Sequence, residues 1–275
     1  MVFKWILASL AAVFVASGTV SVPAQTGTDI ACIVPQVLSA IGEKDARSQE
    51  CTLGDAVADA VRAALEADIA VVCGGDLINN LLPGEITWDG LRAVFKEDRP
   101  LAVAAVTPKE LRGILEGGLS HITLDETETI DRVASAYDGF PQISGFMLSY
   151  DVSAPPGMRV YEIRLNGEKL DLEDDMTVLK LAATEHMLSG GYGLPVIGGA
   201  DSSEMTLSGA LAEYMNNGIT EYTTLTVRIY PMGGQDGSLK SLFPLGIAAV
   251  LILLIVVGNG QRFKHMYDFG SKEED

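Results

Sequence analysis

Two patterns of apolar residues follow each other along this chain, and together they predict a domain that mixes helices with strands. Apolar side chains recur at helical spacing from Gly54 to Leu65, which predicts an amphipathic helix that begins at Thr52 or Gly54. An unbroken run of small and branched apolar residues from Ile69 to Cys73 predicts a short buried strand that is closed by two glycines. The two elements form a tight helix-to-strand unit.

The same kind of pattern continues toward the C-terminus. Thr107-Pro108-Lys109-Glu110 combines an N-cap threonine, a proline at the first helical position and a glutamate three residues after the cap, which predicts a helix that ends at Gly117-Gly118. Asn166-Gly167 predicts a type I′ hairpin turn, and the acidic segment 120–138 predicts a solvated loop or a variable insertion. The remaining expected elements are a short strand followed by a helix at 86–95, strands at 101–106, 144–150, 158–165, 177–183 and 222–230, and a helix at 207–216.

The N-terminal residues have the order of a secretory signal. Lys4 precedes an almost uninterrupted apolar run from Trp5 to Ser17, and the small residues that follow suit cleavage after Ala24. We therefore expect a signal peptide at residues 1–24, with an uncleaved N-terminal anchor as the alternative.

A second apolar stretch lies near the C-terminus and predicts a membrane anchor. Residues 242–258 carry no charge and reach the lower limit of the roughly 17–25 residues that cross a hydrocarbon core. Arg262 and Lys264 follow at once, and cationic residues favour the cytoplasmic side of a span. We expect a single-pass protein of the cell membrane, with its domain outside and a cytoplasmic tail at 259–275. A buried core helix is the alternative.

The net charge and the spacing of the cysteines exclude some classes of function for this chain. The chain carries a formal net charge of −18, which repels polyanions, so a nucleic acid is disfavoured as a partner. The cysteines follow no C-x-x-C spacing, so neither a zinc site nor a redox motif is expected. Because Cys73 falls in the predicted buried strand, Cys32 and Cys51 remain as a candidate disulfide in an extracytoplasmic compartment.

Five short motifs, in register along the chain, carry a resemblance to a known family. They are R-S-Q-E-C-T-L-G-D from Arg47 to Asp55, A-D-I-A-V-V-C-G-G from Ala67 to Gly75, G-E-I-T-W from Gly84 to Trp88, F-P-Q-I-S-G from Phe140 to Gly145, and L-S-G-G-Y-G from Leu188 to Gly193. In this order they resemble the C-terminal domain of the 5'-nucleotidase family, which includes UDP-sugar hydrolases and ecto-5'-nucleotidases.

The resemblance covers residues 41–230, between a lead-in at 25–40 and a glycine-rich stalk at 231–241. It implies an α+β fold with α/β/β/α layers. Together with the predicted anchor, the expected fold class is this layered domain of 5'-nucleotidase C-terminal type plus one C-terminal transmembrane helix.

The resemblance also implies that the catalytic half is missing. In the family this domain binds the nucleotide, whereas a separate metallophosphoesterase domain supplies two metal ions and a catalytic Asp-His pair. Such a centre needs several imidazoles, yet the chain has only His121, His186 and His265, and no D-x-H or G-N-H-D segment. We therefore expect no catalytic residue, no metal ligand and no cofactor in this chain.

The binding half is altered as well. By the resemblance, the asparagine and arginine that hold phosphate and sugar correspond to Cys73 and Ile78, the two base-stacking aromatics to Glu97 and His186, and the ribose-binding aspartate to Tyr192. A nucleotide phosphate needs charge-assisted contacts, and stacking contributes roughly 1–3 kcal/mol per base in nucleic-acid sites. We therefore expect these substitutions to lower the affinity for nucleotides strongly.

By the resemblance, only Arg47 is retained among the groups expected to touch the ligand directly, and each candidate position has a structural alternative. The candidate ligand-binding residues are Arg47, Gly74, Gly75, Asp76, His186, Gly190, Gly191 and Tyr192. The glycines are also typical of turns that need positive φ or close backbone approach. Arg47 fits either a ligand contact or an ion pair with Glu50. His186 and Tyr192 fit either a new stacking surface or two ordinary half-buried side chains.

These observations favour a membrane-anchored, extracytoplasmic domain that is not catalytic by itself and serves as a degenerate nucleotide-binding or accessory module. Two alternatives stay open. The first is the substrate-binding half of a split hydrolase of nucleotide catabolism, which binds a nucleotide or nucleotide-sugar and acts with a separate metallophosphoesterase chain. The second is a structural or adhesive surface domain with an acidic interface.

Overall fold

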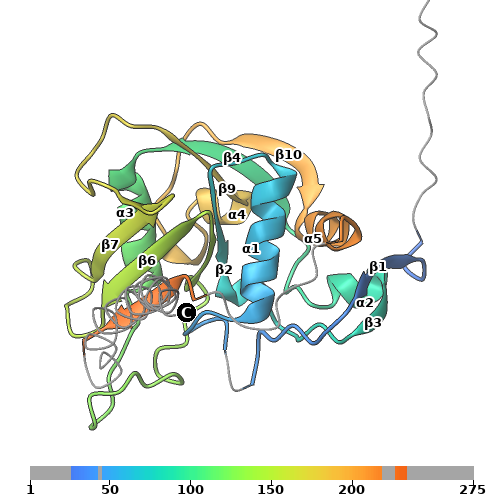
Figure 1. The fold of residues 1–275 in the computed structure, drawn as a ribbon, viewed down its shortest axis with the longest axis horizontal. Coiled ribbons are helices and arrows are strands. Elements are labelled where there is room, and N and C mark those ends of the chain that lie inside the picture. Colours follow the sequence, from blue (N-terminus) through green and yellow to red (C-terminus); the bar gives the residue numbers. More distant parts are fainter. Residues whose placement is uncertain (1–25, 43–44, 219–226, 234–275) are drawn as a thin grey trace, which may run out of the picture.

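The computed structural model describes residues 26–42, 45–218 and 227–233. The predicted signal peptide, most of the predicted stalk, the predicted anchor and the tail lie outside these residues. Within the described part of the chain, no helix combines the length and apolar character needed to cross a membrane. Figure 1 shows a mixed α/β fold in which short helices lie against the sheets.

The elements are named in chain order. The helices are α1 (Thr52–Ala64), α2 (Trp88–Arg92), α3 (Pro108–Gly118), α4 (Glu185–Leu188) and α5 (Leu207–Asn216). The strands are β1 (Ile30–Val34), β2 (Ile69–Cys73), β3 (Gly84–Thr87), β4 (Pro100–Val106), β5 (Pro141–Ser144), β6 (Phe146–Asp151), β7 (Val160–Leu165), β8 (Glu168–Lys169), β9 (Leu179–Thr184), β10 (Asp201–Thr206) and β11 (Ile229–Met232). They form sheets with the orders β1-β3, β10-β4-β9-β2-β5 and β11-β6-β7-β8.

The five-stranded sheet separates two hydrophobic cores. β2 is buried along its whole length because successive side chains serve opposite cores. Ala70 and Val72 belong to the core beneath α1 and α5, whereas Ile69, Val71 and Cys73 belong to the core that α3 shares with the four-stranded sheet. In Figure 1, α1 lies in front of β2 and beside α5. The predicted buried strand is confirmed, as is the burial of Cys73.

A single residue, Gly145, carries the chain from one sheet to the next. The sequence predicts one strand at 144–150, but β5 and β6 lie in different sheets. Gly145 has a φ of +88°, and a Cβ there would lie 2.4 Å from the main-chain oxygen of Asp68. A residue with a side chain fits this bend poorly on both counts. The predicted strand therefore corresponds to β6, and only its start is wrong, because Ser144 belongs to β5.

Strong local signals gave correct element ends. Thr107 caps α3 in a full capping box with Glu110. Asn166 and Gly167 both have positive φ, as a type I′ turn requires, and they join β7 to β8. α5 spans the predicted residues 207–216.

All three cysteines are buried free thiols, so the candidate disulfide between Cys32 and Cys51 is not formed. Cys51 has another role, because it is the N-cap of α1 and its Sγ accepts the N–H of Gly54 at 3.3 Å. α1 begins at Thr52, which is one of the two predicted starts, and its N-cap is the residue before it.

The sequence does not predict β1 and β10. β1 lies in the expected lead-in at 25–40 and pairs with β3, whereas β10 is a polar edge strand beside β4. The loop at 120–138 also differs from the expectation of a solvated segment. Its side chains Ile122, Ile130 and Ser135 are buried, so this loop contributes to the second core.

The C-terminal strand overlaps the end of its predicted range. A strand is expected at 222–230, but β11 begins at Ile229 and continues to Met232, within the predicted stalk. It pairs with β6 in parallel. Residues 219–226 lie outside the described residues.

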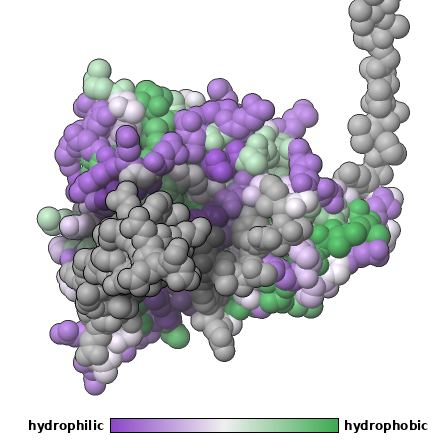
Figure 2. Space-filling view, viewed as in Figure 1, coloured by the Kyte–Doolittle hydropathy of each residue, from purple (hydrophilic) through white to green (hydrophobic). Residues whose placement is uncertain are grey.

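Most of the coloured atoms in Figure 2 are polar, and a green apolar area lies at the end formed by β1 and β3. There, Ile30 and Ile33 of β1 are 54% and 61% exposed. The polar remainder agrees with the net charge of −18.

Candidate functional site

The turn after β2 brings three segments into close contact. Gly74 donates its N–H to the main-chain oxygen of Phe140 at 2.8 Å, and Gly75 donates to that of Asp138 at 2.9 Å. A Cβ on Gly74 would lie 1.9 Å from the oxygen of Ala46. A Cβ on Gly75 would lie 2.4 Å from Cβ of Asp138. Close approach therefore accounts for both glycines without any ligand.

Asp76 follows these glycines and is fully buried. Its Oδ1 accepts hydrogen bonds from Nε of Arg99 at 3.0 Å and from the hydroxyl of Tyr192 at 2.7 Å. Its Oδ2 has no partner among the described residues. Burial raises the pKa of Asp76 above its ordinary value, while the bonds from Tyr192 and Arg99 oppose that rise.

Tyr192 is held on several sides. Its φ of 57° lies in the left-handed region, which is uncommon for a residue with a side chain. The ring of His186 meets it edge-on with centroids 4.8 Å apart, and Lys96 and Arg99 lie over its ring at 5.7 and 5.9 Å. Burial, and then the bond to Asp76, raise the pKa of Tyr192, so the phenol stays protonated at neutral pH.

Beside this group lies a pocket of about 410 Å³, lined by Glu97, Asp98, Arg99, Pro100, Glu185, His186 and Ser189. Its volume falls in the range of small-molecule sites. Arg99 is the cation of the lining, but it is already engaged by Asp76 and by Glu97, with Nη1 to Oε2 at 3.2 Å. The carboxylates that surround the pocket therefore oppose a phosphate group.

Arg47 lies on the loop before α1. Its side chain is 44% exposed and pairs with Asp45, with Nη2 to Oδ2 at 2.7 Å. The hydrogen bond from Arg47 lowers the pKa of Asp45. The alternative of an ion pair with Glu50 is wrong, because Glu50 is buried and binds main-chain N–H groups of Arg228 and Ile229.

Gln142 of β5 holds this loop in place and is itself fully buried. Its Nε2 donates to the main-chain oxygens of Ala46 and Gln49, each at 2.8 Å. Its Oε1 accepts the N–H of Cys51 at 3.2 Å. One side chain thus satisfies three main-chain groups of the segment that carries Arg47.

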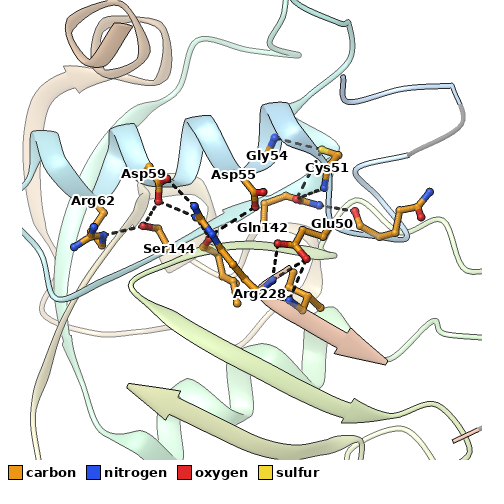
Figure 3. Close-up of polar contacts among 12 residues, drawn as sticks. Glu50, Cys51, Gly54, Asp55, Asp59, Arg62, Gln142, Ser144 and Arg228 are labelled. Carbon is orange, nitrogen blue, oxygen red and sulfur yellow. Dashed lines mark hydrogen bonds and ion pairs between the residues drawn. The ribbon is translucent and has the colours of Figure 1, made fainter. Parts of the chain in front are cut away.

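Charged side chains gather behind the same loop, as Figure 3 shows. The guanidinium of Arg228 donates to both oxygens of Asp59, at 2.8 and 2.7 Å, and its Nε lies 3.9 Å from Asp55. Glu50 lies at the start of α1 on the same side. The sequence signal for this cluster is weak: Asp55 and Asp59 are two carboxylates one turn apart in a helix built mostly of apolar residues.

The structure brings three of the predicted site residues together: Asp76 binds Tyr192, and Tyr192 contacts His186. Sequence reasoning missed Arg99 and Lys96, which complete this group. The only available signal was the charged run that precedes β4, and such a run more often faces solvent.

Other predicted positions have structural roles or lie elsewhere. Gly190 has a φ of +90°, and a Cβ on Gly191 would lie 2.4 Å from Nε2 of His186. Cys73 is buried in the second core, and Ile78 is 44% exposed on the surface. Neither substituted position presents a polar group to the pocket.

Among the described residues, no group of three or more His, Cys, Asp or Glu side chains is arranged to hold a metal ion.

The chain is similar to known proteins in sequence and in fold. Residues 18–199 match the family model described as 5'-nucleotidase, C-terminal domain. The trifunctional nucleotide phosphoesterase protein YfkN of Bacillus subtilis (strain 168) is 27% identical over 209 residues, which are 72% of this chain and 13% of that protein.

Two solved structures share the fold. The 5'-nucleotidase precursor from Thermus thermophilus has a TM-score of 0.61 at 20% identity, over 74% of this chain and 39% of that one. The putative 5'-nucleotidase from Staphylococcus aureus has a TM-score of 0.62 at 15% identity, over 74% of this chain and 41% of that one. The chain therefore corresponds to less than half the length of each relative.

Proposed function

Because this chain belongs to the 5'-nucleotidase C-terminal domain family, we propose that it serves as a ligand-binding or accessory module that does not hydrolyse phosphate esters by itself. The group of Asp76, Arg99 and Tyr192 carries this proposal. Tyr192 binds Asp76 and lies beneath two cations, and Asp76 and Glu97 engage Arg99. The guanidinium of Arg99 is thus paired with protein carboxylates and is not available to bind a phosphate.

The composition of the pocket supports the same reading. The resemblance implies two aromatic side chains that stack on either side of a base. The corresponding positions hold Glu97 and His186, which line the pocket, and the ring of His186 meets that of Tyr192 edge-on. Carboxylates and a hydroxyl dominate the lining. Such a lining suits a neutral or cationic polar ligand better than a nucleoside phosphate.

Calorimetry tests the proposal on the full chain in detergent, with AMP, UMP and UDP-glucose. We expect dissociation constants weaker than about 1 mM, which is a binding free energy of about −4 kcal/mol or less favourable. A micromolar constant for any of the three would overturn it. Glu97→Phe should raise the affinity for AMP roughly tenfold if stacking is the missing contact. Glu185→Gln, which removes a charge without adding a ring, serves as the matched control.

We place the domain outside the cell, tethered by residues 242–258 after removal of residues 1–24. The support is the sequence pattern of the two ends. Protease treatment of intact cells should remove the domain and leave a short C-terminal fragment in the membrane fraction. Protection of the domain in intact cells would contradict this orientation.

A second function, the substrate-binding half of a split hydrolase, is favoured by Arg47. Arg47 keeps exposed surface on a loop that Gln142 holds in place. The partner in this function is a separate metallophosphoesterase chain. Mixing the two proteins should raise phosphate release above that of the partner alone, and Arg47→Ala should abolish the gain. No gain would exclude this function.

A further inference from the structure

The antiparallel ribbon formed by residues 30–41 and 78–87 is apolar on both of its sides. β1 pairs with β3, and Leu38 and Leu81 continue this pairing through two main-chain hydrogen bonds of 2.9 Å. One side of the ribbon supplies buried side chains, Leu38 and Leu81 among them, to the core beneath α1 and α5. The other side is exposed, where a strand that faces water usually carries polar residues. Six aliphatic residues of the ribbon are 37–62% exposed: Ile30, Ile33, Val37, Ile41, Ile78 and Leu82.

These six residues belong to one surface, which we call the apolar ribbon. Val37 and Leu82 lie opposite each other, directly beside the main-chain bridge. Beyond the bridge, the N–H of Ile41 binds Oδ1 of Asn80 at 3.0 Å, so the two segments stay together. The green area in Figure 2 lies at this end of the molecule. Six half-exposed aliphatic residues give a patch of roughly 500 Å², a size that is often functional on a monomer.

Charge is nearly absent from the apolar ribbon. Neither residues 30–41 nor residues 77–84 contain Asp, Glu, Lys or Arg, although charged residues make up 20% of the chain. A strongly charged partner finds no counter-charge on such a surface, so its occupant must be apolar and uncharged as well. At the rim, where β3 ends, Asp89 and Arg92 are exposed and carry opposite charges 3.7 Å apart. A rim that carries both signs is compatible with its own copy.

The size of the patch agrees with the needs of a dimer. A specific interface buries about 800 Å² on each partner, and somewhat more than half of that area, about 450 Å², is apolar. The apolar ribbon supplies this share by itself. A two-fold axis would place the same surface on both sides of the contact, while most of the net charge of −18 stays outside it.

A lipid surface is the other apolar occupant, and the charges at the border of the ribbon disfavour it. Elements that lie in a membrane interface carry Lys or Arg beside their apolar face. Here the exposed residues that border the ribbon include the carboxylates of Asp29 and Glu85, which would have to approach the lipid headgroups.

We propose that two copies of this chain associate through the apolar ribbon, around a two-fold axis that passes close to Val37 and Leu82. These two residues lie in the middle of the ribbon, so each meets its own counterpart in the other copy. The contact is apolar at its centre and is opposed only by the like net charge of the two copies.

Single cysteines on the ribbon test this proposal in intact cells that express the full chain. The three native thiols are buried, so they react slowly with maleimides. With a membrane-permeable bismaleimide, Val37→Cys and Leu82→Cys should each give a crosslinked dimer, because the axis brings each new thiol close to its twin. Met176→Cys, which is 83% exposed outside the ribbon, is the matched control. The ribbon positions should give about tenfold more dimer than this control, and equal yields would overturn the proposal.

A charge placed on the ribbon checks that the crosslink reports a packed contact. In the Val37→Cys protein, Leu82→Glu should lower the yield to that of the control, because two carboxylates then meet across the axis. Val178→Glu, at a site that is 64% exposed outside the ribbon, should leave the yield unchanged. Crosslinking that persists in folded Leu82→Glu would contradict the proposal. If Leu82→Glu does not fold, the comparison with Met176→Cys still decides the question.

Salt separates self-association from the other occupants. In detergent-free lysates, the yield should rise between about 50 mM and 500 mM salt, because screening weakens the repulsion between the two copies and leaves the apolar contact in place. A yield that falls with salt would mean a charged contact and would overturn the proposal. Ribbon thiols that are protected from a soluble maleimide but form no crosslink would identify a lipid surface or another protein as the occupant, with the same consequence. Because no ligand takes part, the outcome is independent of the proposed function.

Discussion

Replacement of Gln142 by leucine should cost a large part of the stability of this domain. The side chain is buried and satisfies the oxygens of Ala46 and Gln49 and the N–H of Cys51. Leucine has similar volume, so the change leaves little cavity, but it deprives three main-chain groups, two buried and one partly buried, of their hydrogen-bond partner. At roughly 1–3 kcal/mol for each unsatisfied group, partly relieved by relaxation, the expected loss is about 3–5 kcal/mol.

Urea unfolding of the purified chain, followed by circular dichroism, measures this loss. With a slope of about 1–3 kcal/mol per molar urea, the midpoint should fall by roughly 2 M while the slope stays constant. The matched control is Gln36→Leu, because Nε2 of Gln36 is buried without a hydrogen-bond partner among the described residues. Removing that group should change the stability by less than about 1 kcal/mol, or raise it.

The stability losses of the two glutamine variants together test whether the hydrogen bonds of Gln142 hold the loop. If Gln142→Leu costs less than about 1 kcal/mol, water or another side chain replaces its three bonds, and the loop that carries Arg47 is not held as described. If Gln36→Leu costs as much as Gln142→Leu, the loss reflects the substitution of glutamine itself rather than the hydrogen bonds.

Three further substitutions have defined outcomes. Gly74→Ala places a Cβ 1.9 Å from the oxygen of Ala46, so it should lower the melting temperature through a loss of about 1–3 kcal/mol; an unchanged melting temperature would contradict the close approach. Tyr192→Phe removes the hydroxyl that binds Asp76 at 2.7 Å, with an expected cost of roughly 1.5–3 kcal/mol in urea unfolding. Thr107→Ala should cost about 1 kcal/mol and increase hydrogen exchange in the first turn of α3, whereas exchange in α5 should not change.

Elements with a strong local signal could be predicted from the sequence. The capping box at Thr107 and the apolar run of β2 each determine their structure within a few residues. β10 could not be found in this way, because a polar edge strand has no hydrophobic alternation and exists through its pairing with β4. The break at Gly145 also escaped prediction, because it depends on the contact with Asp68, which is remote in sequence.

The candidate site was predictable only in part for a related reason. Asp76 and Tyr192 came from the resemblance, and the structure brings them together across 116 positions. Arg99 is not in any of the five motifs, and its role appears only when the start of β4 is placed beside Asp76. The contact of Arg228 with Asp59 spans 169 positions, and no local pattern encodes such a pair.

The burial of every thiol makes the unlabelled protein suitable for timing its own unfolding. Cys32 lies in β1, Cys51 at the start of α1 and Cys73 at the end of β2, and burial raises the pKa of each, that of Cys51 to about 12. An alkylating reagent attacks the thiolate, so each sulfur reacts only after its surroundings separate. Peptide mass spectrometry after a pulse of maleimide would therefore give the order in which these three regions come apart.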